Sequence, residues 1–395
     1  MRFTRLAVIP VCVVCLFAVT RIAGAQTVPH SSHVWILNEE NHSFEEVVGN
    51  SQMPYFNQLI SQYGLATQFY SDQHGSLPAL MWFVAGAPVT TNEDTVSCNH
   101  TGDNVVRELL NQGYSWRSYQ EDLPYPGYQG LYGGSGNKYY RRHNPLIDFS
   151  DVCPGTGQDL NIVPYTQLAD DVSDGTTINF AWVTPDVDHD AHSGTLSAAD
   201  QWLQANVPAI LARPEFQPGG DGILFIVWDE SELQGDDQCS ATVLQGCGGH
   251  TATLVIGPQV TPGYQSTITY HNENVLATVC AAMGLTTCPG AAQSAAPMAD
   301  FFNGSQTPSG VQILSPTSGE IISAGSPVHV VAQANEPFSV SQLQVWDNGV
   351  KLGHWDGSTV DQYFNLGSGT HQLTVTDHNQ QYVRIHQSTV TFTVQ

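Results

Sequence analysis

The sequence predicts a mostly parallel β-sheet sandwiched by helices, an α/β fold, followed by a small immunoglobulin-like β-sandwich. Up to Asn303, short apolar runs typical of buried strands alternate with amphipathic helical patterns. That order favours a parallel sheet covered on both faces. Beyond this point, apolar residues recur at every second position in short runs separated by Asn-Gly and Gly-Ser turns, a pattern typical of a sandwich.

Residues 1–25 predict a signal peptide. Arg2 and Arg5 precede an apolar run, and Ala23-Gly24-Ala25 is the kind of small-residue site that signal peptidase cuts. The run is short for a membrane span, so we expect a secreted or periplasmic protein with no stable membrane insertion after cleavage. Arg21, close to the cleavage site, leaves an uncleaved anchor as the alternative.

Cleavage would change the charge and the cysteine content. It removes three arginines and no acidic residue, so the formal net charge falls from −25 to −28, which disfavours nucleic acid as a partner. Six cysteines remain, and an even number in an exported chain suggests disulfides. Several pairings are possible; the short-range choices Cys239–Cys247 and Cys280–Cys288 are preferred, which leaves Cys98–Cys153.

The mature chain divides into three segments. Residues 26–303 form the α/β domain, residues 304–310 a polar linker with Gly and Pro, and residues 311–395 the sandwich. In the α/β domain the predicted strands are 34–37, 178–183, 222–228 and 253–256, and the predicted helices are 54–64, 103–113, 198–213 and 272–284.

Two of the predicted strands end in acidic pairs. Glu39 and Glu40, followed by Asn41, come after the first strand, and Asp229 and Glu230 follow the strand 222–228. Neighbouring side chains on a strand point to opposite faces, so such pairs can converge only where the strand ends. Converging carboxylates raise one another's pKa unless a cation neutralises them. The pattern therefore favours a metal site, with exposed acids at the start of two loops as the alternative.

A serine in the segment QHGSLPALMWFVAG is a candidate anion-binding residue. Ser76 follows a glycine and precedes a helical run that begins near Pro78. A hydroxyl there lies beside the backbone N–H groups of a helix amino terminus, where an anion is stabilised. A serine that only caps the helix is the alternative.

Two further segments carry candidate binding groups. Lys138, Arg141, Arg142 and His143 fall close together and predict a positive patch for an anionic ligand; two surface arginines before a turn are the alternative. The loop WVTPDVDHDAHSGTLSAADQWL, which includes His192, follows the strand 178–183. Its carboxylates and histidines are suited to metal binding or proton transfer, since histidine titrates near neutral pH.

Several ordered motifs resemble the bacterial phosphoesterase family. They are ILNEENHSFEEVVG, QHGSLPALMWFVAG, WRSYQEDLP, RRHNPL, TPDVDHDAHSGT, ADQWL, IVWDES and IGPQVTPGY, and the resemblance covers about residues 33 to 290. That family contains non-haemolytic phospholipases C and acid phosphatases and belongs to the alkaline-phosphatase-like superfamily. The resemblance implies that residues 26–303 form an exported, metal-dependent, acid-phosphatase-like catalytic domain.

The resemblance also implies roles for particular residues. It makes Ser76 the nucleophile of a phosphoserine mechanism, with His143 and His192 as further catalytic residues. It assigns substrate contacts to Arg142, His143 and His271. It implies one divalent ion, Ca, Mg, Mn, Zn or Fe, held by Glu40, Asn41, Asp229 and Glu230. The family often has Pro-Asn where this chain has Pro78-Ala79.

Two other functions fit the sequence. A phospholipase C acting on phospholipid head groups would need an aromatic surface, for which the candidates are Trp82, Phe83, Tyr125, Tyr128, Tyr132, Tyr139 and Tyr140. A non-catalytic surface-binding protein would rely on the sandwich instead. The sequence leaves the phosphate ester, the metal, the oligomeric state and the role of the sandwich open.

Overall fold

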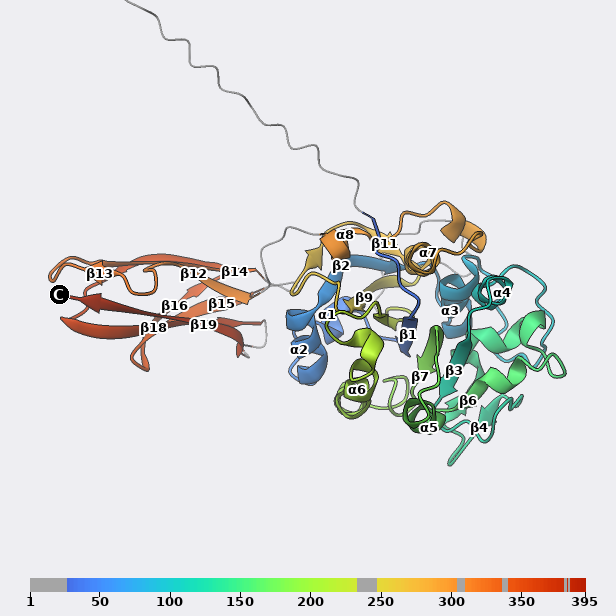
Figure 1. Cartoon of the computed structure of the whole chain (residues 1–395). Helices are drawn as coiled ribbons and strands as arrows, with labels where there is room; N and C mark the ends of the chain where they lie inside the picture. The colour runs from blue at the N-terminus through green and yellow to red at the C-terminus, as the bar shows by residue number, and fades with distance from the viewer. Residues whose placement is uncertain (1–26, 233–246, 304–309, 336–339, 380–381, 383) are drawn as a thin grey trace, which may run out of the picture.

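The computed structural model describes residues 27–232, 247–303, 310–335, 340–379, 382 and 384–395. The predicted signal peptide, Cys239 and nearly all of the predicted linker lie outside these ranges. Figure 1 shows an α/β body that holds most of the chain and a narrower β-sandwich formed by its carboxyl-terminal part.

A nine-stranded sheet forms the centre of the α/β body and confirms the predicted fold. Its strand order is β10-β2-β9-β8-β1-β7-β3-β6, and β11 also pairs with β2. All pairings are parallel except those of β9 with β2 and β8. The strands are β1 (Val34–Glu39), β2 (Gly64–Ser71), β3 (Trp116–Gln120), β6 (Ile162–Pro164), β7 (Phe180–Thr184), β8 (Ile223–Trp228), β9 (Gly249–Ile256), β10 (Gln265–Ser266) and β11 (Tyr270–His271).

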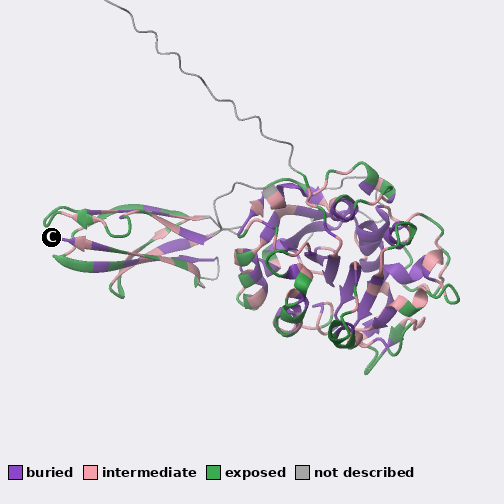
Figure 2. Cartoon of the chain, in the orientation of Figure 1, coloured by how far each residue is buried: buried purple, intermediate pink, exposed green. Residues whose placement is uncertain are grey.

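Helices cover both faces of this sheet. The helices are α1 (Phe44–Val47), α2 (Pro54–Gln62), α3 (Ser76–Ala85), α4 (Val105–Asn111), α5 (Gln167–Ser173), α6 (Leu196–Leu211), α7 (Asn272–Met283) and α8 (Asp300–Asn303), with short 3-10 turns η1 (Arg141–His143), η2 (Pro145–Asp148), η3 (Ser150–Val152), η4 (Asp159–Asn161), η5 (Pro214–Phe216) and η6 (Gly290–Gln293). The sheet and the inner helix faces are buried (Figure 2).

The central strand β1 shows how the sequence sets the two faces. Val34 and Ile36 belong to the apolar cluster that contains α3, α4 and α7. Trp35 and Leu37 belong to the cluster that contains α2 and α6. Alternate residues of a strand point to opposite faces, and therefore an apolar residue is needed at each position from Val34 to Leu37.

The sandwich contains two sheets around one apolar core. The smaller sheet has the order β12-β14-β17 and the larger one β13-β19-β18-β15-β16. The strands are β12 (Gly310–Ser315), β13 (Ile321–Ile322), β14 (Val328–Asn335), β15 (Gln342–Asp347), β16 (Val350–Asp356), β17 (Thr359–Phe364), β18 (Gly369–His378) and β19 (Arg384–Val394); a separate hairpin in the α/β body is made by β4 (Tyr132–Gly133) and β5 (Tyr139–Tyr140).

Two of the three preferred disulfides are present. Cys98 is bonded to Cys153 and Cys280 to Cys288, while the third pairing includes Cys239, which is not among the described residues. None of the helices in the described part of the chain has both the length and the apolar character needed to cross a bilayer.

Candidate active site

The candidate site lies where three adjacent parallel strands end. In the sheet, β1 lies between β8 and β7. Glu40 follows β1, Asp229 follows β8, and the loop that carries Asp190 follows β7. Ligands of such sheets bind beyond the carboxyl ends of the strands, so the sheet topology alone brings these three carboxylates to one place.

Ser76 contacts this group of carboxylates directly. Its Oγ donates a hydrogen bond of 2.7 Å to Oε2 of Glu40, and its side chain is only 4% exposed. The helix α3 begins at Ser76 itself and not near Pro78, because Gly75, with φ of 90°, turns the chain into the helix. Positive φ favours glycine at this position. Ser76 is therefore the first helical residue and not the cap.

Glu40 and Asp229 form a buried acidic pair. Burial raises the pKa of Glu40 well above its ordinary value, and the charge of Asp190 adds to this rise. Burial, Glu40 and Glu230 raise the pKa of Asp229 in the same way. The two carboxyl groups lie close enough to influence the pKa of each other, and a cation between them would favour the charged form of both.

The residues present fit a divalent cation. Oδ2 of Asp229 is buried and makes no hydrogen bond within the described residues, and oxygen ligands of this kind are those that hard cations prefer. The other two predicted ligands have further contacts. The backbone N–H of Asn41 donates to Oδ1 of Asp229 (2.8 Å), and Glu230 accepts hydrogen bonds from His74 (2.5 Å) and from the N–H of Gly75 (3.0 Å).

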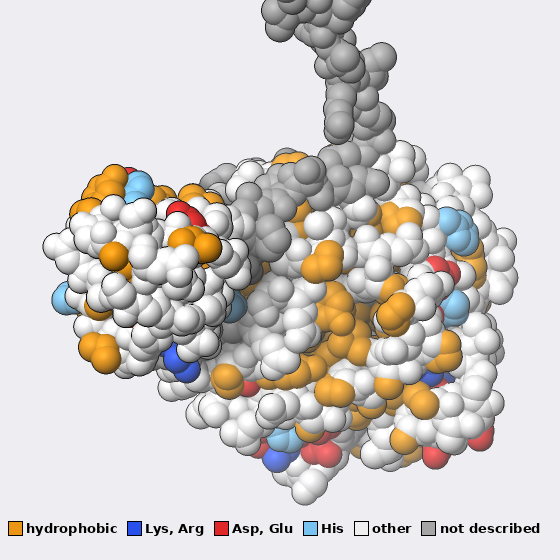
Figure 3. Space-filling view, turned by 60° about the vertical axis from the view of Figure 1, so that its left-hand side comes forward, with side chains coloured by type: hydrophobic (Ala, Val, Ile, Leu, Met, Phe, Trp, Pro, Cys, Tyr) orange, Lys and Arg blue, Asp and Glu red, His pale blue; other side chains and the backbone are white. Residues whose placement is uncertain are grey.

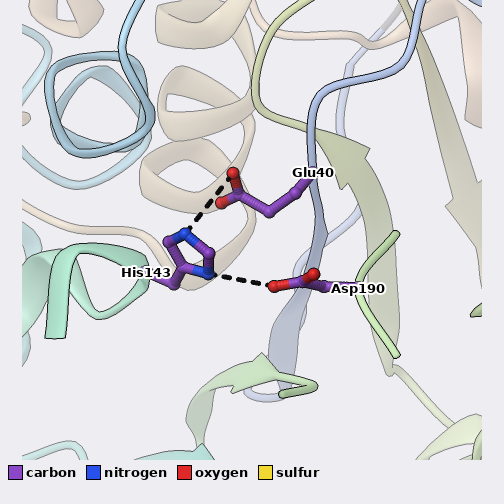
Figure 4. A group of neighbouring side chains, drawn as sticks. All are labelled: Glu40, His143 and Asp190. Atoms are coloured by element: carbon purple, nitrogen blue, oxygen red, sulfur yellow. Dashed lines mark hydrogen bonds and ion pairs between the residues drawn. The ribbon is translucent and has the colours of Figure 1, made fainter. Parts of the chain in front are cut away.

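His143 lies between two carboxylates (Figure 4). Its Nδ1 is 2.9 Å from Oδ2 of Asp190, and its Nε2 is 3.6 Å from Oε2 of Glu40. Burial and the neighbouring charge of Arg142 lower the pKa of His143 to about 3. The ring is therefore neutral, and with a proton on Nδ1 it presents the Nε2 lone pair toward Glu40. Glu40, His143 and Asp190 also form a group whose ligand atoms could together hold a metal ion.

His192 stands beside His143 at the edge of the site. The two rings are 5.3 Å apart, and the ring of Tyr140 is 5.7 Å from that of His192. The backbone N–H of His192 donates to Oδ1 of Asp190 (2.8 Å), so Asp190 positions both histidines. Burial, His143 and Arg142 lower the pKa of His192 to about 4.

The predicted positive patch is wrong, because each of its basic side chains is paired with an acid. Arg141 is buried and bonded to Asp148 (2.6 Å). Lys138 pairs with Asp188 (2.9 Å). Arg142 pairs with two acids, Glu93 (3.1 Å) and Asp94 (2.7 Å). The sequence spacing showed the cluster of basic residues but gave no sign of these four partners, each of which lies at least seven residues away in the chain.

Glu93 was not expected at the site. Burial raises the pKa of this carboxyl group, and Arg142 and the backbone N–H of Ser76 offset the rise only in part. Glu93 thus lies between Arg142 and the amino terminus of α3, where the sequence predicts the anionic ligand. A lone glutamate in an irregular segment has no pattern that would have identified it.

His271 lies apart from the other candidates. It ends β11, which pairs with β2, and its Nδ1 is 3.6 Å from Oδ1 of Asp72. Burial lowers its pKa. Among the contacts of the described residues, none joins His271 to Ser76 or Glu40.

A buried serine beside clustered carboxylates on an alkaline-phosphatase-like fold suits a phosphoric ester hydrolase. The chain belongs to the Phosphoesterase family, whose model matches residues 50–286. A bacterial Ig domain model matches residues 310–375. Membership of the family, together with relatives that are phosphatases, makes the chain a phosphoric ester hydrolase.

Three similar proteins illustrate this relationship. Phosphatidylinositol-3-phosphatase of Mycobacterium tuberculosis is 29% identical over 71% of this chain and 85% of its own length. An acid phosphatase of Aspergillus fumigatus is 28% identical over 64% of this chain, which spans only 54% of that protein. Among solved structures, a Vibrio parahaemolyticus protein of the alkaline phosphatase superfamily matches 66% of this chain and 68% of its own, with 13% identity and a TM-score of 0.46.

Proposed function

We propose that the chain is an exported, metal-dependent phosphatase that hydrolyses phosphate esters through a phosphoserine intermediate on Ser76. The observation that carries this proposal is the hydrogen bond from Ser76 to Glu40 at the amino terminus of α3. It combines a nucleophile, a proton acceptor and a helix end that stabilises anions. The acid phosphatases among its relatives support a phosphate monoester as the substrate.

The first half of the reaction forms the phosphoserine. Oγ of Ser76 attacks phosphorus as the bond to the leaving oxygen breaks, and Oε2 of Glu40, which accepts the Oγ hydrogen bond, receives the proton. A divalent cation held by Glu40, Asn41, Asp229 and Glu230 would supply positive charge that favours the alkoxide and the phosphoryl oxygens. The backbone N–H groups at the start of α3 stabilise the same oxygens.

Histidines complete the proton transfers. His192 is the partly exposed ring of the pair and can protonate the leaving alkoxide. Its pKa is lowered by burial and by positive neighbours, and the negative charge of a bound phosphate ester reverses that influence. His143, held by Asp190, can accept the proton from Glu40 through Nε2. Water then hydrolyses the phosphoserine and regenerates Ser76.

The aromatic candidates for a phospholipid surface differ in burial. Trp82, Phe83 and Tyr139 are buried, so they cannot contact a lipid, while Tyr128 and Tyr140 are partly buried. Tyr125 and Tyr132 are exposed and could contact a lipid. Phospholipids are therefore among the substrates to assay. A panel of phosphomonoesters, phosphodiesters and phospholipids, assayed after chelation with each divalent metal restored in turn, distinguishes phosphatase from phospholipase C.

The direct test is Ser76→Ala. We expect turnover to fall by about 10³-fold or more, because water must replace a positioned nucleophile, while folding and metal content stay unchanged. Mass spectrometry after acid quench should find phosphate on the wild-type peptide that contains Ser76. Ser31→Ala is the matched control, since Ser31 is also fully buried but precedes β1. Retention of more than about a tenth of wild-type turnover would exclude Ser76 as the nucleophile.

A further inference from the structure

The outer face of the larger sandwich sheet carries a tryptophan where a polar residue is expected. Along β15, Leu343 and Val345 point into the core, so Gln344 and Trp346 point outward. The paired strand β18 places Thr374 opposite Trp346 and Thr376 opposite Gln344. An aromatic ring on an otherwise polar outer face has no role in the core of the sandwich.

Trp346 lines a hollow in this face. The hollow has a volume of ≈ 410 Å³, and its other lining side chains include Gln344, Gln372, Thr374, Arg384 and Gln387. Nε1 of Trp346 is buried and makes no hydrogen bond within the described residues. An unsatisfied buried donor costs free energy, so the stability of the sandwich alone does not account for a tryptophan at this position.

Both basic side chains of the sandwich lie at the same place, in a segment that also carries six acidic residues. Residues 311–395 contain two basic residues, Lys351 and Arg384, in a protein on which basic side chains are scarce (Figure 3). Nζ of Lys351 lies 5.8 Å from the centre of the Trp346 ring, and Arg384 donates to Gln387 on the wall of the hollow (3.2 Å). Neither cation has an acidic partner among the ion pairs of the described residues.

These groups match the chemistry of an acidic sugar. A sugar ring presents C–H groups that pack on an indole face, hydroxyls that bond to amides and threonine hydroxyls, and, in a uronic acid, a carboxylate for Lys351 or Arg384. The large negative charge of the rest of the protein is screened beyond about 8 Å at physiological salt. A lipid would need a wider apolar surface, and a protein strand would pair with a sheet edge and not with a sheet face.

We propose that this hollow binds an anionic polysaccharide that contains uronic acids. The sandwich would then hold the phosphatase on an acidic glycan matrix. The site is independent of the phosphatase chemistry, because its residues all follow Ser341, whereas every candidate catalytic residue precedes the linker.

Affinity electrophoresis of the full-length mature protein through gels that contain polygalacturonate tests the proposal. We expect retardation of the wild type that weakens as salt rises, and at least a tenfold weaker interaction for Trp346→Ala. The double substitution Lys351→Gln and Arg384→Gln should weaken binding and remove most of its salt dependence. Gels that contain dextran are the neutral comparison.

Tyr363→Ala is the matched control. Tyr363 is 66% exposed and stacks on His329 in the other sheet of the sandwich, so its loss should leave retardation unchanged. Phosphatase turnover and near-ultraviolet circular dichroism check that each variant is folded, and Gln344→Ala provides a milder change in the same hollow. The proposal is overturned if the wild type is not retarded, if dextran retards it equally, or if Tyr363→Ala weakens binding as much as Trp346→Ala.

Discussion

Glu39 and Glu40 are neighbours in the chain, but the end of β1 directs them differently. Glu40 reaches Ser76. Glu39 is the last residue of the strand and follows the alternation that sends Trp35 and Leu37 toward α2 and α6. Burial raises its pKa well above the ordinary value, and the charges of Asp190, Asp200 and Glu121 add to the rise. Burial thus favours the protonated form of Glu39, and only one member of the acidic pair, Glu40, contacts the candidate nucleophile.

Arg142 is the residue whose role depends most on a partner that the sequence did not reveal. The carboxylate of Glu93 lies beside Arg142, so a substrate phosphate that contacts Arg142, as the family resemblance implies, would have to displace it. We expect Glu93→Gln to lower KM for a phosphate monoester about three- to tenfold with little change in kcat, because it removes a competing charge worth roughly 1 kcal/mol at a partly exposed site.

The competition between Glu93 and the substrate for Arg142 also predicts a pH effect. Because the pKa of Glu93 is raised, its carboxyl group takes up a proton at a higher pH than an ordinary glutamate does. Protonation of Glu93 breaks its ion pair with Arg142, so the KM of the wild type should fall as the solution becomes mildly acidic. The Glu93→Gln variant should lack this fall in KM. Asp94→Asn is the control, since Asp94 pairs with Arg142 but is mostly exposed. A higher KM in Glu93→Gln would mean that Glu93 positions Arg142 for the substrate.

At the level of elements, Asp200 illustrates a structural acid within a segment that resembles the family. It lies in α6, and its carboxylate accepts hydrogen bonds from the N–H groups of Tyr55 (3.0 Å) and Phe56 (2.8 Å). These groups open α2 after Pro54 and have no partner within that helix. Asp200 thus caps a neighbouring helix, and we expect it to take no part in the hydrolysis.

We expect Asp200→Ala to lower the free energy of unfolding by about 1–3 kcal/mol, since two buried N–H groups lose their acceptor. Turnover per folded molecule should stay within about twofold of the wild type. Urea denaturation followed by circular dichroism measures the free energy of unfolding. Steady-state turnover, divided by the amount of phosphorylated Ser76 peptide found after acid quench, measures the turnover per active molecule. Asp170→Ala, in the exposed part of α5, provides a control. A large loss of turnover with unchanged stability would place Asp200 in the catalytic machinery.

The outline of the whole molecule could be predicted from the sequence, but several contacts could not. The strand at 34–37, the acidic ends of two strands and the alternating pattern of the sandwich are local features, so they indicated the sheet, the position of the site and the second fold. The predicted strand at 253–256 is part of β9, which runs antiparallel to its neighbours, a direction that residue pattern alone does not give.

The unpredicted parts depend on contacts between distant segments. Asp190 was seen only as one of several acids in a loop, and its place beside Glu40 arises because β7 adjoins β1 in the sheet. Glu93 lies in irregular chain whose path is set by tertiary contacts, so periodicity gave no information about it. Arg141 belongs to the basic cluster of the sequence, but it can be buried because its guanidinium forms an ion pair with Asp148.

The division of the chain into a catalytic part, residues 26–303, and a sandwich, residues 311–395, remains our proposal and predicts the behaviour of a truncated protein. Residues 26–303 alone should retain kcat and KM for a small phosphate monoester within about twofold, because every candidate catalytic residue precedes the linker. Steady-state kinetics on the truncated and full-length mature proteins measure this. If a folded truncated protein lost turnover, the sandwich would have to contribute to the site.

The Cys98–Cys153 disulfide has a consequence for competition between anions. Cys98 follows closely after Glu93 and Asp94, and Cys153 lies beyond Arg142, so the bond tethers the carboxylate to the neighbourhood of its guanidinium partner. A short tether presents a group at an effective concentration on the order of millimolar or higher. We therefore expect free phosphate at micromolar levels to compete poorly with Glu93 for Arg142. We also expect reduction of the bond to lengthen the tether, to lower this effective concentration and to make turnover more sensitive to added phosphate.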